Sequence, residues 1–89
     1  MSQNKPIKTY KHSTTGRSVE AAVWANESES GNVFYSTTFT VQYRDGEEWK
    51  TSKGYGVSDL YQLIRCATDA AAFIFFEEMK QRRELGEAA

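Results

Sequence analysis

The sequence predicts an α+β domain in which a bent antiparallel sheet of three or four strands is followed by one long C-terminal helix. Apolar and polar residues alternate with a period of two over residues 18–26 and again over residues 33–44, which is typical of half-buried strands. No Pro or Gly interrupts the chain between Ser58 and Gly86, and the apolar spacing there predicts a helix. A length of 89 residues corresponds to one domain, which excludes a two-domain enzyme.

The first 17 residues form a basic arm whose composition differs from that of the rest of the chain. This arm contains no acid and four cations, which are Lys5, Lys8, Lys11 and Arg17. Ile7 and Tyr10 offer too little apolar surface to order it, so we expect a flexible arm unless it lies on a sheet edge or a ligand. An extra edge strand at residues 7–10 is the alternative.

Two predicted strands follow the arm, and each has one side that suits a core. The strand over residues 18–26 places Val19, Ala21 and Val23 on one side and Trp24 on the other. After a polar turn at residues 27–32, the longer strand over residues 33–44 carries its better core candidates at odd positions. These are Val33, Tyr35, Thr37, Phe39, Val41 and Tyr43.

Asp45-Gly46 predicts a hairpin turn, because Gly adopts positive φ without a steric penalty, and residues 49–57 can then return as a third strand. A two-residue loop would place Trp49 beside Gln42, whereas a three-residue loop would place it beside Val41. We favour the three-residue loop because it brings Tyr55 near Tyr35 and gathers the aromatic residues on one face. That face would hold Phe39, Val41, Tyr43, Trp49 and Tyr55.

The predicted helix begins at Ser58, which can cap it, with Asp59 in the first turn. A broad apolar stripe is expected to lie across the sheet and consists of Leu60, Leu63, Ile64, Ala67, Ala70, Ala71, Ile74 and Phe75. Phe73, Phe76 and Cys66 lie outside this stripe. Because the outer side of such a helix is normally polar, we expect Phe73 and Phe76 to form the interface of a homodimer. The single domain spans residues 18–78, and residues 79–89 form a charged C-terminal tail.

One helix covers only one side of a sheet, so the other side must face water, a partner or a ligand. We assign Trp24 and Phe34 to this open side, together with Arg44, Lys50 and several hydroxyl side chains. Rings stack on unpaired bases and cations meet phosphates, which favours a small non-enzymatic nucleic-acid-binding protein that prefers single strands. Phosphate contacts would also come from the cations of the arm. The alternative is a protein-interaction or structural module of a mobile element or phage, with its open side packed against protein.

No residue cluster predicts catalysis or metal binding, and we expect neither a catalytic site nor a cofactor. His12 is the only histidine and lies in the polar arm, while Cys66 is the only cysteine and has no thiol partner for a disulfide or a zinc site. The counts of 11 basic and 12 acidic residues give a net charge of −1, which by itself names no partner. Without an apolar N-terminal run to act as a signal peptide or membrane span, we expect a cytoplasmic protein of a reducing compartment.

Three segments carry a resemblance to a known family, and they lie at residues 19–24, 39–50 and 56–60. Over roughly residues 18–78 the chain resembles the single-stranded-DNA-binding transcriptional coactivators and their Whirly relatives. Through residues 23–27, 35–39 and 59–60 it is also similar to small bacterial and phage proteins of unknown function. The coactivator resemblance implies a homodimer joined largely through its helices, with nucleic acid lying on the sheets.

Overall fold

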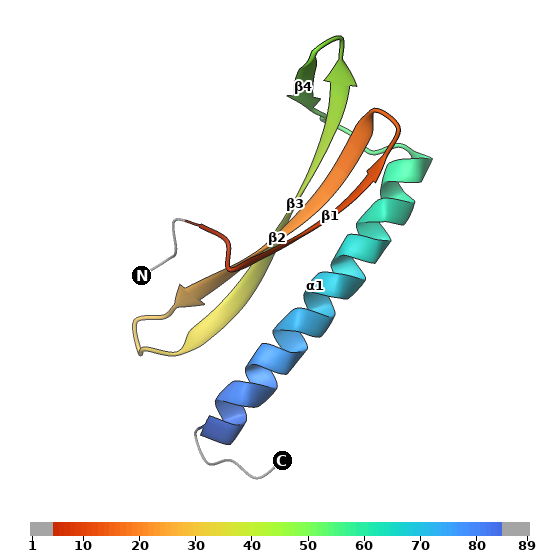
Figure 1. Ribbon diagram of the computed structural model, residues 1–89. Helices are drawn as coiled ribbons and strands as arrows, with labels where there is room; N and C mark the ends of the chain where they lie inside the picture. Colours follow the sequence, from red (N-terminus) through yellow and green to blue (C-terminus); the bar gives the residue numbers. More distant parts are fainter. Residues whose placement is uncertain (1–4, 85–89) are drawn as a thin grey trace.

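A computed structural model describes residues 5–84, which form four strands followed by one helix (Figure 1). The strands are β1 (Lys8–Thr14), β2 (Arg17–Glu27), β3 (Val33–Asp45) and β4 (Glu48–Thr51), and the helix is α1 (Val57–Glu84). They form a single antiparallel sheet in the order β1-β2-β3-β4. The α+β class with one long C-terminal helix is therefore confirmed, and the sheet has four strands.

The basic arm is largely an ordered edge strand, so the expectation of a flexible arm is wrong for residues 8–14. β1 pairs with β2 along its whole length, from Lys8 opposite Val23 to Thr14 opposite Arg17. Gly16 has a φ of 73°, which lets the chain reverse within two residues between these strands. Tyr10 then packs against the core, and this burial helps to hold the strand. The edge-strand alternative is confirmed and extended, while residues 1–4 lie outside the described residues.

The helix packs on one face of the sheet, chiefly against β2 and β1 (Figure 1). Fully buried apolar side chains in the described residues are Val19, Ala21, Val23, Val41, Cys66 and Ala70. Tyr35 and Phe39 of β3 pack around this core from odd positions, as expected. The molecule measures 53 × 26 × 17 Å, so it is elongated and only two layers thick.

The β3–β4 hairpin has a two-residue loop, so the favoured three-residue loop is wrong and Trp49 does not share the face of Tyr43. The strands also pair in a different register from the one expected of a two-residue loop, because Trp49 lies opposite Arg44 and not beside Gln42. Asp45 pairs with Glu48, so the loop is Gly46 and Glu47, with Gly46 at a φ of 66°. Across the hairpin, Lys50 Nζ lies 2.8 Å from Asp45 Oδ2, an ion pair that this register allows. Trp49 therefore pairs with Arg44. The expected third strand at residues 49–57 is also shortened, because β4 ends at Thr51 and leaves Tyr55 outside the sheet.

The helix is rotated relative to the predicted apolar stripe. Cys66 and Ala70 are buried against the sheet with Leu63, Phe73 and Ile74 beside them. Other members of the predicted stripe are exposed, namely Leu60, Ile64, Ala71 and Phe75. The small side chains of Cys66 and Ala70 let the helix approach Ala21 closely, which is a packing advantage that a count of large apolar residues does not reveal.

An ion pair at the start of the helix accounts for this rotation. Asp59 is 1 % exposed and accepts two hydrogen bonds from Arg17, from Nε at 2.8 Å and from Nη2 at 2.7 Å. Asp59 Oδ2 also accepts the backbone N–H of Gly56 at 2.9 Å, while Leu60 N donates to Gly56 O at 3.0 Å. Gly56, and not Ser58, is thus the N-cap, and Asp59 reaches back to it in the manner of a capping box.

The helix continues through most of the segment expected to be a tail. α1 ends at Glu84, so residues 79–84 are helical, and the remaining residues 85–89 lie outside the described residues. Within the described part of the chain, the helix is not long and apolar enough to cross a membrane.

Replacing Asp59 with Asn should destabilise the fold, because it removes the charge of a buried carboxylate and leaves the Arg17 guanidinium, whose side chain is 33 % exposed, against a neutral partner. We expect the unfolding temperature at neutral pH to fall by on the order of 10 °C. Asp69→Asn is the matched control. Asp69 is far more exposed than Asp59, so this substitution should lower the unfolding temperature much less. An Asp59→Asn protein as stable as the wild type would contradict the anchoring role.

Asp59→Asn should also change how the stability of the fold depends on pH. Hydrogen bonds from Arg17 hold the pKa of the Asp59 carboxyl below its ordinary value, although burial opposes this. A lowered native pKa gives stability that is complete above the ordinary carboxyl pKa and is lost as the pH falls through the lowered one. Thermal unfolding between pH 7 and pH 2 should therefore show an acid-dependent loss in the wild type that is smaller in Asp59→Asn.

Candidate nucleic-acid interface

The side of the sheet opposite α1 is called the open face here, and within residues 5–84 no other element covers it. Strand register decides which side chains it carries, because directly paired residues of an antiparallel sheet point to the same side. Its polar and charged members are Thr9, Lys11, Ser13, Ser18, Glu20, Asn26, Ser36, Thr38, Thr40, Gln42, Arg44 and Thr51. Three aromatic side chains complete it, and they are Trp24, Phe34 and Trp49.

The aromatic side chains of the open face lie at its two ends. Trp24 and Phe34 lie near the β2–β3 turn, where Trp24 pairs with Ser36. Trp24 Nε1 donates to Thr38 Oγ1 at 2.9 Å, so the indole leans along the sheet and presents part of its ring to solvent. Phe34 is 51 % exposed and Trp49, at the opposite end, is 49 % exposed. Three rings with accessible surface therefore share one side of the sheet.

Trp49 is a candidate binding residue that the sequence analysis placed on the wrong face. Its position depends on which residues form the hairpin loop, and Asp45, an expected turn residue, belongs to β3 and pairs with Glu48. The opposite charges of Asp45 and Lys50, five residues apart in the sequence, favour a hairpin in which pairing continues to Asp45. This was the sequence feature that could have predicted the register.

Two of the cations proposed to meet phosphates do lie on the open face, and these are Lys11 and Arg44. Arg44 Nε donates to Gly46 O at 2.9 Å, which directs the guanidinium towards the hairpin loop. Lys11 lies opposite Glu20 on β2, so one acid accompanies the two cations on this face. Lys5 is exposed just before β1.

Arg17, another cation expected to contact phosphate, is engaged on the helix side of the sheet. Its guanidinium is held by Asp59, lies over the Tyr43 ring at 5.9 Å, and faces the helix and not the open face. The hydrogen bonds to Asp59 raise the pKa of Arg17 above its ordinary value. Its guanidinium is therefore paired within the fold, on the side of the sheet that faces α1.

Lys8 and Lys50 also lie on the helix side of the sheet. The expected place of Lys50 on the open side is therefore wrong, and Lys8, expected to contact phosphate from the arm, belongs to β1. Lys8 Nζ lies 5.5 Å from the centre of the Tyr10 ring, which packs against the core. Lys50 pairs with Tyr43 across the hairpin and makes its ion pair with Asp45. Both positions follow from the register of β1 and β4.

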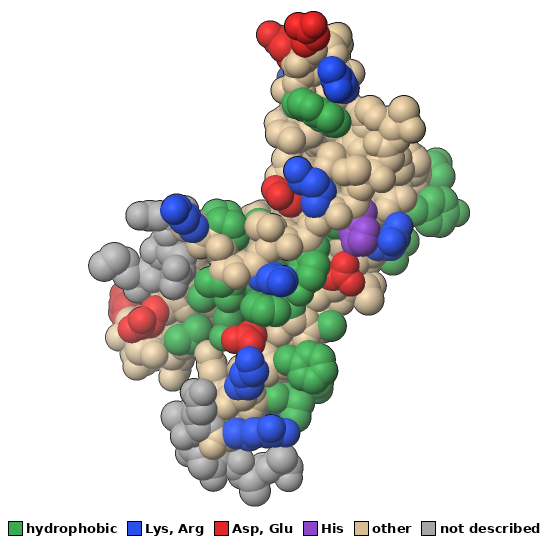
Figure 2. Space-filling view, in the orientation of Figure 1, with side chains coloured by type: hydrophobic (Ala, Val, Ile, Leu, Met, Phe, Trp, Pro, Cys, Tyr) green, Lys and Arg blue, Asp and Glu red, His purple; other side chains and the backbone are tan. Residues whose placement is uncertain are grey.

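The two phenylalanines expected at a dimer interface have different surroundings. Phe73 packs against the core of its own chain, whereas Phe76 is 63 % exposed. Phe76 meets Phe75 edge to face, with ring centres 6.0 Å apart. The apolar surface of α1 that faces away from the sheet consists of Val57, Leu60, Tyr61, Ile64, Phe75 and Phe76, called here the outer stripe. In Figure 2, hydrophobic side chains reach the surface near both ends of the helix.

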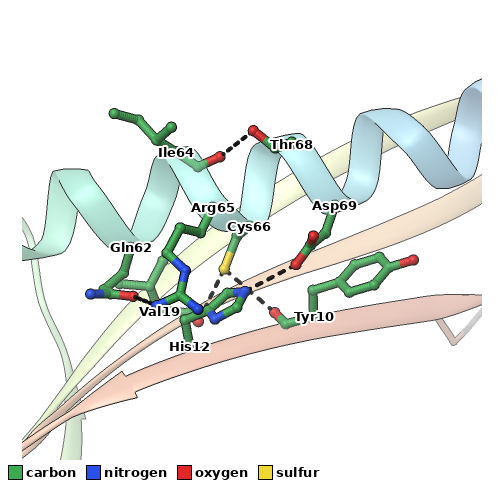
Figure 3. Close-up of polar contacts among 9 residues, drawn as sticks. All are labelled: Tyr10, His12, Val19, Gln62, Ile64, Arg65, Cys66, Thr68 and Asp69. Carbon is green, nitrogen blue, oxygen red and sulfur yellow. Dashed lines mark hydrogen bonds and ion pairs between the residues drawn. The ribbon is translucent and has the colours of Figure 1, made fainter.

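Cys66, His12 and Asp69 lie close together where α1 crosses β1 (Figure 3). The Cys66 thiol donates to Val19 O at 3.4 Å and approaches Tyr10 O at 3.8 Å, while His12 Nε2 lies 3.0 Å from Asp69 Oδ2. Burial raises the pKa of the Cys66 thiol, which is the opposite of the shift that activates a nucleophile. The arrangement therefore joins the helix to the edge strand. His12 takes part in this contact and does not lie in a polar arm.

Comparisons with known proteins give no match to a family model, a curated protein or a solved structure. The resemblance to the single-stranded-DNA-binding coactivators accordingly stays a prediction. Among residues 5–84, no group of three or more His, Cys, Asp or Glu side chains is placed to hold a metal ion.

Proposed function

We propose that this protein is a non-enzymatic nucleic-acid-binding homodimer that holds single strands on its open face. The observation that supports this most strongly is the composition of that face, where Trp24, Phe34 and Trp49 accompany Lys11 and Arg44. Rings with accessible surface stack on bases, and the two cations can neutralise phosphates. Hydroxyl and amide side chains between the rings offer hydrogen bonds to bases and sugars.

Single strands fit this surface better than a duplex does. In a duplex the faces of the bases are stacked on one another, so protein rings cannot reach them without unstacking. A sheet with half-exposed rings offers stacking partners only to bases that are already unpaired. With few cations on the open face, stacking has to supply a large share of the affinity.

The outer stripe favours pairing of the helix with a second copy of the chain. Four of its members lie on one line along the helix with Thr68 and Ala71, at alternating spacings of four and three residues. These four are Val57, Tyr61, Ile64 and Phe75. This spacing is the one by which two helices bury a common seam. The chain has a small core and a large exposed apolar area on α1, so burial of the outer stripe would add the apolar contact that a two-layer monomer lacks.

A protein-interaction module of a mobile element or phage is the second candidate, and the outer edge of β3 favours it. β4 pairs only with residues 42–45, so in the described part of the chain residues 33–40 have no strand on that side. These eight residues contain no charge and no Pro, the features that usually protect a free edge. A strand from another protein can extend a sheet at such an edge.

Binding to a labelled single-stranded oligonucleotide of about 20 bases tests the proposed function, and fluorescence anisotropy measures it. We expect the single strand to bind more tightly than a duplex, and Trp24→Ala or Phe34→Ala to weaken binding by about 1–3 kcal/mol for each lost stack. With two or three phosphate contacts for each chain, a fourfold rise in salt should cost about tenfold in affinity.

Two lysines of the same strand provide a matched pair for this measurement. Lys11 lies on the open face and Lys8 on the helix side. Lys11→Ala should reduce the salt slope by roughly 0.7, and Lys8→Ala should leave it nearly unchanged. No binding at low salt by the folded wild-type protein would reject nucleic-acid binding and leave the interaction module ahead.

If the outer stripe joins two chains, the average mass in solution should rise with protein concentration, and substitutions in the stripe should abolish this rise. Phe75→Asp should give a folded monomer, because Phe75 is 59 % exposed in the single chain and a charge there would have to be buried on pairing. Arg65→Asp is the control, since Arg65 is an exposed polar position on the same helix. Analytical ultracentrifugation with a monomeric wild type at tens of micromolar would exclude this dimer.

A further inference from the structure

A hollow of about 300 Å³ lies on the open face, at the end that carries Trp49. It draws one or more side chains from every strand, namely Lys11 and Ser13 from β1, Ser18 from β2, Gln42 from β3 and Trp49 from β4. Ser18 is only 8 % exposed although no other layer of the described chain covers this face, so it forms the floor. The hollow exists because the short β4 strand places the Trp49 side chain beside Gln42 and Arg44.

The lining combines the groups that recognise one unit of a nucleic acid. Trp49 supplies a flat, half-exposed ring, and Gln42 supplies an amide that can both donate and accept hydrogen bonds. Ser13 Oγ donates to Ser18 Oγ at 3.3 Å, which leaves the Ser18 hydroxyl proton free to turn towards a ligand. Lys11 is the one charged group among the described residues that line the hollow. An anionic ligand with an aromatic ring therefore fits better than a cationic or aliphatic one.

The dimensions favour a single nucleotide. A volume of about 300 Å³ is at the small end of ligand sites, which suits one base with part of its sugar. Ser18 and Trp24 are six residues apart on β2, so the hollow lies about 20 Å from the rings near the β2–β3 turn. The open face thus has two separate stacking positions, and a bound strand would have to extend across the sheet to reach both.

We propose that this hollow is a nucleotide subsite, in which one unpaired base stacks on Trp49 and meets Gln42 and Ser18 while an adjoining phosphate meets Lys11. The inference rests on the proposed function, and it adds a site whose residues are distinct from Trp24 and Phe34. The Trp49 ring provides the stacking surface, the Gln42 amide contacts the edge of the base, and the Lys11 ammonium carries the phosphate. The subsite fixes the position of one nucleotide on a surface that otherwise binds strands without a fixed register.

Tryptophan fluorescence tests the subsite directly, because the chain contains two tryptophans. In Trp24→Phe protein all tryptophan emission comes from Trp49. Titration with a single-stranded oligonucleotide of about 20 bases should quench this emission with the same midpoint as anisotropy measures, since the stacked base contacts the indole. In Trp49→Phe protein, the emission of Trp24 reports the other stacking position in the same way.

Affinity measurements supply the second arm. Trp49→Ala should weaken oligonucleotide binding by about 5- to 100-fold, whereas Trp49→Phe, which keeps a ring, should retain most of the affinity. Circular dichroism and thermal unfolding of both variants show that the hairpin change has not unfolded the domain. If the wild type binds and Trp24→Ala weakens binding, but Trp49→Ala binds like the wild type and Trp49 emission does not change, the subsite is wrong and the proposed function stands. If the wild type binds no oligonucleotide, both are rejected.

Discussion

The ion pair between Arg17 and Asp59 determines how the helix lies on the sheet, and the rest of the molecule depends on that placement. Arg17 is the first residue of β2 and Asp59 lies in the first turn of α1, so the pair joins the two layers at one end. Asp59 also accepts the backbone N–H of Gly56, the N-cap of the helix. The same carboxylate therefore fixes where the helix starts and which of its sides faces the sheet. A buried carboxylate with a bidentate Arg partner tolerates few alternative geometries, which is why it can specify one rotation.

This rotation divides the apolar side chains of α1 between two surfaces. Cys66, Ala70 and Phe73 go to the sheet, and the outer stripe goes to solvent. The opposite face of the sheet receives no helix, so its side chains are available to a ligand. A thin two-layer domain with a few buried residues thereby has two uncovered surfaces of different chemistry. The outer stripe is aliphatic and aromatic, and the open face mixes rings, hydroxyls and cations. The proposed dimer rests on the first composition, and the proposed binding of a nucleic-acid strand rests on the second.

The sequence predicted the element types and the longer strand boundaries well, because these depend on local periodicity. The strands expected at residues 18–26 and 33–44 correspond to β2 and β3 within a residue at each end. Three features could not be obtained in this way. β1 is held by pairing and by Tyr10 in the core, and not by its own composition. The helix rotation depends on a contact between residues 42 positions apart. The hairpin register depends on the Asp45–Lys50 ion pair together with the turn at Gly46.

The same long-range contacts explain which candidate site residues lie on the predicted face of the sheet and which do not. Trp24, Phe34 and Arg44 have the expected side of the sheet because they belong to the two long paired strands. Arg17 looked like a free cation because its partner lies far along the chain, and Lys50 and Trp49 exchanged faces when the hairpin register shifted by an odd number of residues. Odd or even position in a strand therefore predicts the face of a side chain only when the residues of the preceding turn are known.

Nuclear magnetic resonance of the protein during titration with a single-stranded oligonucleotide tests most directly whether the open face is the ligand surface. Indole N–H signals of Trp24 and Trp49 report the open face, and methyl signals of Ile64 and Ile74 report the outer and inner sides of α1. If the open face binds the strand, both indole signals shift in proportion to bound strand while both isoleucine signals stay in place. Shifts confined to Ile64 and the outer stripe, with unchanged indole signals, would contradict binding to the open face.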